Sequence, residues 1–352
     1  MKSKNLIIGL VCLFVLMVVF TLTTKSQKPA EPPKFETIVI GTGGEPKWSP
    51  DGTRLAFMSG GWLCVANADG KGKIQRIAQL QPWTFDWMSD SAFVVSDKIP
   101  WNPPGKGRGH KFIIETVDMK GEVQIIREDS LAPGNEAERQ YVSYIGAPVI
   151  LKDGTVGYYE IHEKPEGETK IFKTIKPGKV KPDSVLNQII VTTEGYPVAG
   201  EICLESVDGT ARKKITPGKK YLFPILSPDN TKILARVERY TGGIVILNLE
   251  GKVLTDLDVD AREISPGLTA SGSGVGASWS PDSKKILYNW IIGDGHSIHD
   301  QDIYMVNADG TGKVAIAAAP NDIEKNASWS PDGRKIAYRS ETSGKIFVVK
   351  LK

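Results

Sequence analysis

Cysteine is scarce in this sequence, and charge of one sign never accumulates in a long run. Three cysteines among 352 residues exclude a small scaffold held together by disulfides. The 44 Lys and Arg residues nearly balance the 41 Asp and Glu residues, which leaves a net charge of +3. Binding to duplex DNA requires many cationic contacts with phosphates. We therefore expect no nucleic-acid partner.

Several catalytic signatures are also missing. The sequence contains no G-x-S-x-G nucleophile elbow, no H-E-x-x-H zinc motif, no Walker A loop and no C-x-x-C pair. The glycine-rich run over 269–276 lacks the Lys-Ser/Thr that completes a phosphate-binding loop. These absences disfavour nucleophile-elbow hydrolases, zinc proteases and P-loop nucleotide enzymes.

One long hydrophobic run is present, at the N-terminus. Residues 5–24 carry no charge, and as a helix they would span about 30 Å, the thickness of a bilayer core. The run exceeds the usual apolar region of a signal peptide, and no A-x-A cleavage pattern follows it. Residues 1–24 are therefore predicted to form a hydrophobic helix that anchors the chain in a membrane, with a cleaved signal peptide as the alternative. Residues 25–35 are Pro-rich and predict a linker. Both alternatives place the remainder outside the cytoplasm, in the periplasm or at the cell surface, either tethered or secreted.

A Ser-Pro-Asp motif repeats along the rest of the chain. Four copies are KWSPDGTRLAF, ILSPDNTKILA, SWSPDSKKILY and SWSPDGRKIAY, at 47–57, 225–235, 278–288 and 328–338. Pro presets the backbone of a turn, Asp bonds back to nearby backbone, and Gly accepts positive φ. An apolar run lies on each side of this turn, so each copy predicts a β-hairpin. The Trp before three of the turns (Trp48, Trp279 and Trp329) is interpreted as core between repeats. Weaker copies occupy 86–95 and 149–159.

A second hairpin follows the first in these repeats. It is a strand, an Asp/Glu-Gly turn and another strand, at 63–73, 202–212, 244–253 and 303–313. Two hairpins make four antiparallel strands, which is one blade of a β-propeller. The spacing predicts an all-β, six-bladed propeller over 36–352. The third repeat is longer than the others, and its extra residues are expected to form either an inserted hairpin or a degenerate seventh blade. The last repeat holds only three strands, and 35–40 is predicted to supply the fourth and to close the ring.

The repeats, with their SPDG and NADG turns, resemble those of the TolB-like family of β-propellers, also described as WD40-like or PD40 repeats. The resemblance covers about 36–352 and implies a propeller fold without fixing a function. TolB itself carries an α/β domain before its propeller, whereas here only the predicted anchor and linker come first. Related oligogalacturonate lyases use a His-bound metal, but their ligand pattern has no residue-by-residue match in this sequence.

Cys64 and Cys203 each lie five residues before an Asp-Gly turn, at the same strand position of two repeats. Equivalent positions in different blades cannot reach the Cα spacing of about 5.5 Å that a disulfide needs. We therefore predict two free, buried thiols.

Function is expected on the face opposite the Ser-Pro-Asp turns. Strand counting places basic, aromatic and imidazole side chains there, and such side chains dominate protein recognition. The predicted binding residues are Trp101, Arg108, His110, Arg139, Tyr141, His162, Arg239, Tyr240 and Arg339. The loop over 98–110 is expected to form a rim that contacts a peptide, a glycan or an anionic group.

The segment GDGHSIHDQD at 293–302 is the densest group of potential metal ligands. Its imidazoles and carboxylates suit a divalent metal. The ligands would be Asp294, His296, His299 and Asp302. The alternative is a solvated loop whose Asp residues cap turns.

Two functions follow from these observations. The first is a non-catalytic propeller, tethered to a membrane outside the cytoplasm, that binds a protein or a cell-wall component through one face. It requires no cofactor. The second is a metal-dependent lyase or hydrolase that acts on a polysaccharide at the predicted metal site.

Overall fold

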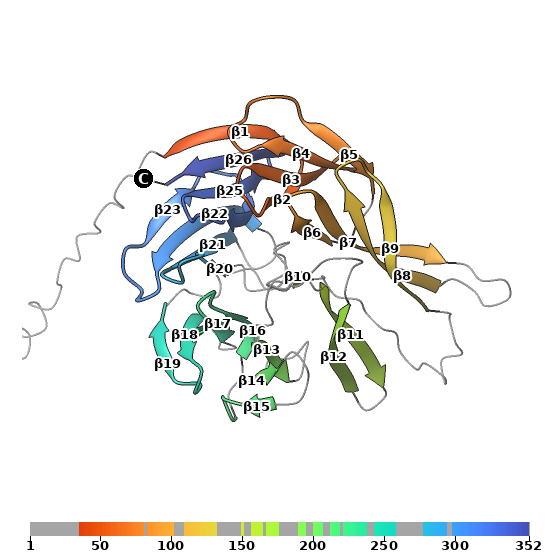
Figure 1. The fold of residues 1–352 in the computed structure, drawn as a ribbon. Helices are drawn as coiled ribbons and strands as arrows, with labels where there is room; N and C mark the ends of the chain where they lie inside the picture. Colours follow the sequence, from red (N-terminus) through yellow and green to blue (C-terminus); the bar gives the residue numbers. More distant parts are fainter. Residues whose placement is uncertain are drawn as a thin grey trace, which may run out of the picture. The chain divides into compact units, whose positions relative to one another are not determined.

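A computed structural model describes most of the propeller region. The described residues are 35–80, 82, 84–101, 109–131, 149–150, 156–164, 167–175, 189–194, 200–206, 212–218, 221–237, 243–257, 277–293 and 298–351. Within these ranges the structure consists of 26 β-strands and contains no helix (Figure 1). The predicted hydrophobic helix and the linker up to residue 34 lie outside the described residues. No helix within the described ranges is long and apolar enough to span a membrane.

Four of the sheets consist of four consecutive strands joined as antiparallel neighbours. The first contains β2 (Gly44–Trp48), β3 (Arg54–Ser59), β4 (Trp62–Asn67) and β5 (Gln75–Gln79). The second contains β6 (Thr84–Ser89), β7 (Ala92–Trp101), β8 (Gly109–Asp118) and β9 (Val123–Leu131). The third contains β16 (Tyr221–Leu226), β17 (Lys232–Val237), β18 (Ile244–Asn248) and β19 (Val253–Asp256). The fourth contains β20 (Ala277–Trp279), β21 (Lys285–Gly293), β22 (Ile298–Asn307) and β23 (Val314–Ala317).

The fifth four-stranded sheet joins the two ends of the propeller region. Its strands are β24 (Glu324–Trp329), β25 (Lys335–Ser340), β26 (Lys345–Lys350) and β1 (Glu36–Thr42). The order is β1-β26-β25-β24, and β1 runs antiparallel to β26 from Glu36↔Lys350 to Thr42↔Lys345. The two strands, red and blue, lie side by side in Figure 1. The prediction that an N-terminal strand completes the last blade is confirmed.

The prediction of six four-stranded blades is not supported. The described residues form five four-stranded blades of an all-β propeller, and the chain between β9 and β16 forms two further sheets of three strands. One consists of β10 (Val149–Ile150), β11 (Val156–Lys164) and β12 (Gly167–Ile175), and the other of β13 (Ile189–Glu194), β14 (Glu201–Ser206) and β15 (Arg212–Lys214). The third repeat was expected to hold either an inserted hairpin or a degenerate seventh blade, and among the described residues its strands form two separate three-stranded sheets.

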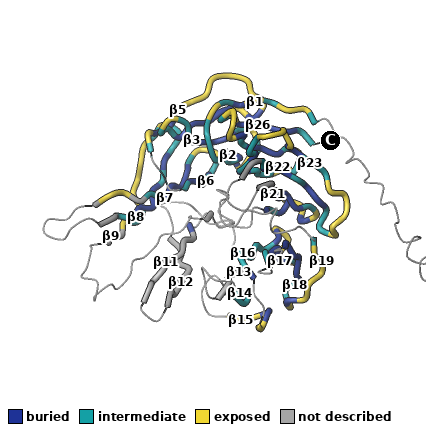
Figure 2. Tube along the Cα trace, turned by 180° about the vertical axis from the view of Figure 1, so that it is seen from behind, coloured by how far each residue is buried: buried dark blue, intermediate teal, exposed yellow. Residues whose placement is uncertain are grey.

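Burial follows the order of strands within each blade. The second and third strands carry the core, as in β3 with the pattern iBBBii, whereas outer strands such as β19 are mostly exposed (Figure 2). Apolar side chains of neighbouring sheets pack face to face between them. One such core joins Leu234 and Ile246 of one blade to Trp279 and Tyr288 of the next. Blade-to-blade burial of apolar surface is therefore the main stabilising term.

Two of the three tryptophans before the Ser-Pro-Asp turns also bond neighbouring sheets to each other. Trp48 Nε1 donates to the Ser328 carbonyl at 3.1 Å, and Trp279 Nε1 donates to the Ile225 carbonyl at 3.2 Å. Trp87, in the weaker repeat, donates to the Lys47 carbonyl at 3.0 Å. In each pair the acceptor lies in the first strand of the preceding blade. The interpretation of these side chains as core between repeats is confirmed, and the indole N–H adds a hydrogen bond to that packing.

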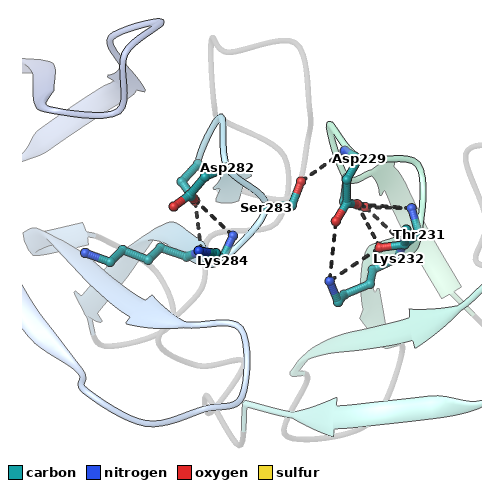
Figure 3. Close-up of polar contacts among 9 residues, drawn as sticks. Asp229, Thr231, Lys232, Asp282, Ser283 and Lys284 are labelled. Atoms are coloured by element: carbon teal, nitrogen blue, oxygen red, sulfur yellow. Dashed lines mark hydrogen bonds and ion pairs between the residues drawn. The ribbon is translucent and has the colours of Figure 1, made fainter.

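The Ser-Pro-Asp turns form a self-satisfied polar network. Ser227 Oγ donates to Asp229 Oδ1 at 2.6 Å, and the Thr231 hydroxyl donates to the same oxygen at 2.8 Å. The next blade's turn joins in, because the Asp229 N–H donates to Ser283 Oγ at 3.0 Å (Figure 3). Burial raises the pKa of Asp229, but these hydrogen bonds and Lys232 outweigh it and bring the pKa to about 2.

Cys64 and Cys203 are both buried and free, as predicted. Burial raises the pKa of the Cys64 thiol, with Arg76 opposing the shift.

Candidate functional site

The structure describes only part of the predicted site. Seven residues lie outside the described ranges: Arg108, Arg139, Tyr141, Arg239, Tyr240, Asp294 and His296. Four lie in strands whose backbone alone is described at those positions: Trp101 in β7, His110 in β8, His162 in β11 and His299 in β22. The side chains of Arg339 in β25 and Asp302 in β22 are described. These two are the starting points for the site.

Two of the expected loops are shorter than predicted. β7 and β8 stay paired to Pro100↔His110 and Trp101↔Gly109, so much of the expected rim over 98–110 is strand. β21 and β22 likewise stay paired to Gly293↔Ile298. In the first case β9 also follows β8 as far as His110↔Leu131. Sequence reasoning had placed both stretches in loops on the strength of their Gly and Pro content.

Arg339 lies at the entry end of the sheets, which we define as the end where the first strands β2, β16 and β24 begin. The Ser-Pro-Asp turns close the opposite end. Arg339 Nη1 lies 3.2 Å from Glu341 Oε2, and Arg339 Nη2 donates to Glu341 Oε1 at 3.3 Å. Lys325, the ladder partner of Arg339, also pairs with Glu341. The hydrogen bond from Lys325 is the main reason that the pKa of Glu341 is lowered.

Glu45 faces this group from the neighbouring sheet. Burial raises its pKa, and the charges of Lys47, Arg339 and Lys325 oppose the shift. Its backbone has φ +56°, which is unusual for a residue other than glycine. Asn326 adopts the same conformation in β24, and each lies three residues before the Trp of its repeat. Both sit at irregularities of their ladders, which are frequent near functional sites.

Asp302 and Glu324 are two carboxyls buried at the entry end, on neighbouring sheets. Glu324 is only 2% exposed, and its Oε1 accepts a hydrogen bond from the Ala319 N–H at 2.9 Å. Burial raises the pKa of Glu324 to about 7, helped by the charges of Asp302, Asp322 and Asp300. Burial and the charge of Asp300 raise the pKa of Asp302 to about 6, although the Tyr304 hydroxyl donates to it at 3.5 Å. Both carboxyls therefore gain or lose their proton near neutral pH, as groups at functional sites often do.

Asp322, by contrast, has a structural role. Its Oδ2 accepts from Ser340 Oγ at 2.5 Å, and its Oδ1 accepts from the N–H groups of Thr342 at 3.1 Å and Ile323 at 2.8 Å. Burial raises its pKa, but these donors bring the net value below normal. Asp322 thereby ties the start of β24 to the connection after β25.

Buried polar atoms without a hydrogen-bond partner concentrate at the entry end. Among the described residues there are six such side-chain atoms, and five of them lie there. They are Arg236 Nε, Asp300 Oδ1, Glu324 Oε2, Asn326 Oδ1 and Arg339 Nε. The sixth, Trp329 Nε1, lies at the other end of β24. Native proteins leave few such atoms unsatisfied, so their grouping marks this end as unlike the turn end.

Arg339 and Asp302 are among the residues predicted from the sequence, whereas Glu324, Asn326 and Glu45 are not. An available signal was the alignment of the repeats themselves. Glu45 and Asn326 take the place three residues before Trp in two repeats, each in the first strand of its repeat. Of the predicted metal ligands only Asp302 has a described side chain. Within the described part of the chain no group of three or more His, Cys, Asp or Glu side chains is placed to hold a metal ion.

Comparison with known proteins returns similarities of fold only. No protein-family model and no curated protein matches the chain. A solved structure of a TolB protein from Agrobacterium tumefaciens is 16% identical, with 89% of this chain and 91% of that chain covered and a TM-score of 0.43. The oligogalacturonate lyase of Vibrio parahaemolyticus is 14% identical, with 88% and 77% covered and a TM-score of 0.42. A gluconolactonase of Xanthomonas campestris is 10% identical, with 92% and 96% covered and a TM-score of 0.46. Similarities this distant assign no function.

Proposed function

We propose that this chain is a binding propeller that engages a protein or a cell-envelope component through the entry end of its sheets. The observation that carries the proposal is the group of buried, unpartnered polar atoms at this end, three of which lie on β24 and β25. Each unsatisfied buried group costs on the order of 1–3 kcal/mol. A partner that supplied the missing donors and acceptors would recover part of that cost on binding. The turn end gains nothing comparable, because Ser-Asp hydrogen bonds within the turns satisfy its polar groups.

The charges at the entry end favour a polar partner over an apolar one. Lys325 and Arg339 lie beside Glu341 and Glu45, the carboxyl of Glu324 precedes Lys325 on β24, and that of Asp302 lies on β22. Mixed charges of this kind select partners by complementarity more than by hydrophobic area. The proposal includes a location outside the cytoplasm, at a membrane that residues 1–24 would anchor. It is supported by the hydrophobic run in the sequence.

Site-specific photocrosslinking tests the proposed surface. A benzophenone side chain at Glu341, an exposed residue of the entry end, is expected to form an adduct in intact cells. The matched control is the same side chain at Arg334, an exposed residue of the Ser-Pro-Asp turn in the same sheet. Adducts at both positions alike, or at Arg334 alone, would contradict the assignment of the surface. Separate fractionation of membranes, with and without residues 1–24, tests the anchor.

A second candidate function is catalysis on a polysaccharide, and one observation favours it. Asp302 and Glu324 have pKa values raised to about 6 and about 7, and a carboxyl that stays protonated near neutral pH can act as a general acid. In the metal-dependent form of this proposal, Asp294, His296 and His299 would join Asp302 as ligands. Metal analysis of the purified protein tests that form. The metal-dependent form is supported if the unaltered chain binds metal, His299→Ala loses it and His162→Ala retains it. It is ruled out if the unaltered chain holds no stoichiometric metal.

A further inference from the structure

Three aromatic rings of one blade surround a single ammonium group. Lys313 Nζ lies 3.5 Å from the ring centre of Trp290, 4.7 Å from that of Tyr304 and 5.9 Å from that of Tyr288. A cation within about 6 Å of an aromatic face is attracted by the negative face of the ring. The other cation–aromatic contacts in the described residues, such as Lys335 over Trp48 at 5.8 Å, involve one ring each. The Lys313 site therefore differs in kind from its neighbours.

Strand register builds this group. β21 and β22 pair Tyr288 with Tyr304 and Trp290 with Asp302, and these two pairs are separated by one rung, so the three aromatic rings and the carboxyl lie on one face of the sheet. The rings also contact each other. The centres of Tyr288 and Tyr304 are 6.0 Å apart with their planes nearly parallel, and those of Trp290 and Tyr304 are 5.7 Å apart and tilted. The site is thus held by the sheet and does not depend on Lys313 for its shape.

A carboxyl completes the chemistry of the site. The Tyr304 hydroxyl donates to Asp302 Oδ2 at 3.5 Å, so the carboxyl lies at the edge of the aromatic group. Aromatic faces together with an acid form the usual recognition site for an ammonium ion. Both Trp290 and Tyr304 are partly exposed, which leaves the group accessible from solvent.

We propose that Tyr288, Trp290 and Tyr304, with Asp302, form a binding site for the ammonium group of a lysine side chain from a partner protein, and that Lys313 occupies this site in the free chain. The present occupant argues for lysine, because it shows that the site accepts a primary ammonium at the end of a four-carbon stem. Lys313 is an exposed residue of the segment that leads from a turn into β23, and its side chain regains rotamer freedom when it swings into solvent. An incoming lysine therefore competes with a tethered internal ligand. This inference holds whether or not the entry end binds a partner.

The test measures binding of a lysine derivative at Trp290. The full chain would be labelled with 5-fluorotryptophan, and the fluorine resonance of Trp290, one of 8 tryptophans, would be assigned by its loss in Trp290→Phe. Nα-acetyl-lysine N-methylamide is then titrated at constant ionic strength into the unaltered chain and into Lys313→Met. Lys313→Met keeps an unbranched apolar side chain and removes the competing charge. We expect saturable shifts in both, with the affinity in Lys313→Met higher by roughly 2- to 30-fold, the range that one internal cation–aromatic contact implies.

Three comparisons decide between outcomes. Lys335→Met removes the lysine that contacts only Trp48, and it should leave the affinity at Trp290 unchanged. Nα-acetyl-norleucine N-methylamide, which lacks the charge, should produce no saturable shift. Phosphocholine tests the other common source of an ammonium group, a lipid headgroup, and tighter binding of phosphocholine than of the lysine derivative would overturn the assignment to lysine.

The proposal is overturned if the lysine derivative leaves the Trp290 resonance of Lys313→Met unmoved while the variant remains folded. In that case Lys313 makes a structural contact only. If Lys313→Met folds poorly, a second measurement compares the shift of the Trp290 resonance in the unaltered chain with that in Tyr304→Leu. Tyr304→Leu should weaken or abolish the shift seen in the unaltered chain, and equal shifts in the two would likewise contradict the site.

Discussion

Glu324 should make the stability of this protein fall as the pH rises from acid to neutral. Its carboxyl is 2% exposed, and its pKa is about 7 in the folded protein against an ordinary value of 4.5. Between these two values the folded state holds a proton that the unfolded state has released. The free energy of unfolding therefore decreases with pH across this window and is lowest above pH 7. A pKa difference of about 2.5 corresponds to about 3 kcal/mol.

Glu324→Gln removes the titrating group while it keeps the oxygen that accepts from the Ala319 N–H. We expect its free energy of unfolding to match that of the unaltered chain near pH 4 and to exceed it by up to about 3 kcal/mol near pH 8. Asp302 contributes in the same direction in both proteins, because burial and the charge of Asp300 raise its pKa to about 6. Guanidinium chloride denaturation at pH values from 4 to 8 measures both effects.

Glu341→Gln is the matched control. Glu341 is exposed, and its pKa is lowered by Lys325, so its contribution is present above the ordinary pKa and is lost as the pH falls. The control variant should therefore lose a little stability at neutral pH and should keep the downward slope of the unaltered chain between pH 5 and pH 7. If Glu324→Gln keeps that slope as well, the buried carboxyl is not its source, and the description of the entry end as a site of proton exchange is wrong.

Three further predictions concern the fold. Trp87→Phe removes the hydrogen bond from the indole N–H to the Lys47 carbonyl and should lower the free energy of unfolding by about 1–2 kcal/mol. A urea titration measures this loss, and an unchanged midpoint of unfolding would show that the hydrogen bond contributes nothing. Gly251→Ala should lower the melting temperature by several degrees, because Gly251 has φ +81° and an added Cβ would collide with the Ile215 carbonyl of the neighbouring sheet. A melting temperature within one degree of that of the unaltered chain would contradict this contact. Asp229→Asn should lower the free energy of unfolding at neutral pH, and the loss should shrink as the pH falls from about 4 towards 2. The reason is that the Asp229 pKa of about 2 lies below its ordinary value of 3.8, so the stability that the carboxylate contributes disappears when it is protonated. A loss of stability independent of pH would point to packing instead.

Local chemistry allowed much of the fold to be predicted. The Ser-Pro-Asp turns are determined by residues within five positions of one another, because Ser49 bonds locally to Asp51 and to the Arg54 N–H, and the bonds to the neighbouring turn are additional. Alternation of apolar residues then identifies the strands on either side. The strand that closes the last blade was also predictable, because that blade lacked a fourth strand and the segment before the first repeat could supply one.

The number of sheets and the make-up of the site could not be read in this way. Whether the strands over 149–214 belong to one blade or two depends on pairing between segments that are distant in sequence, and the repeat pattern is too weak there to decide it. Glu324 is an ordinary glutamate until the start of β24 packs beside Asp302 from another sheet and excludes water. Its raised pKa is thus a property of the assembled blades.

The sequence alone determined the all-β class, the repeated hairpins, the free cysteines and the closing strand, because turn residues and alternating hydrophobicity act over a few neighbouring positions. Tertiary structure alone decided which polar atoms are buried without partners and which rings surround Lys313. Strand register placed Trp290 beside Asp302 and Tyr288 beside Tyr304, and a shift by one residue would have turned those side chains to the opposite face of the sheet.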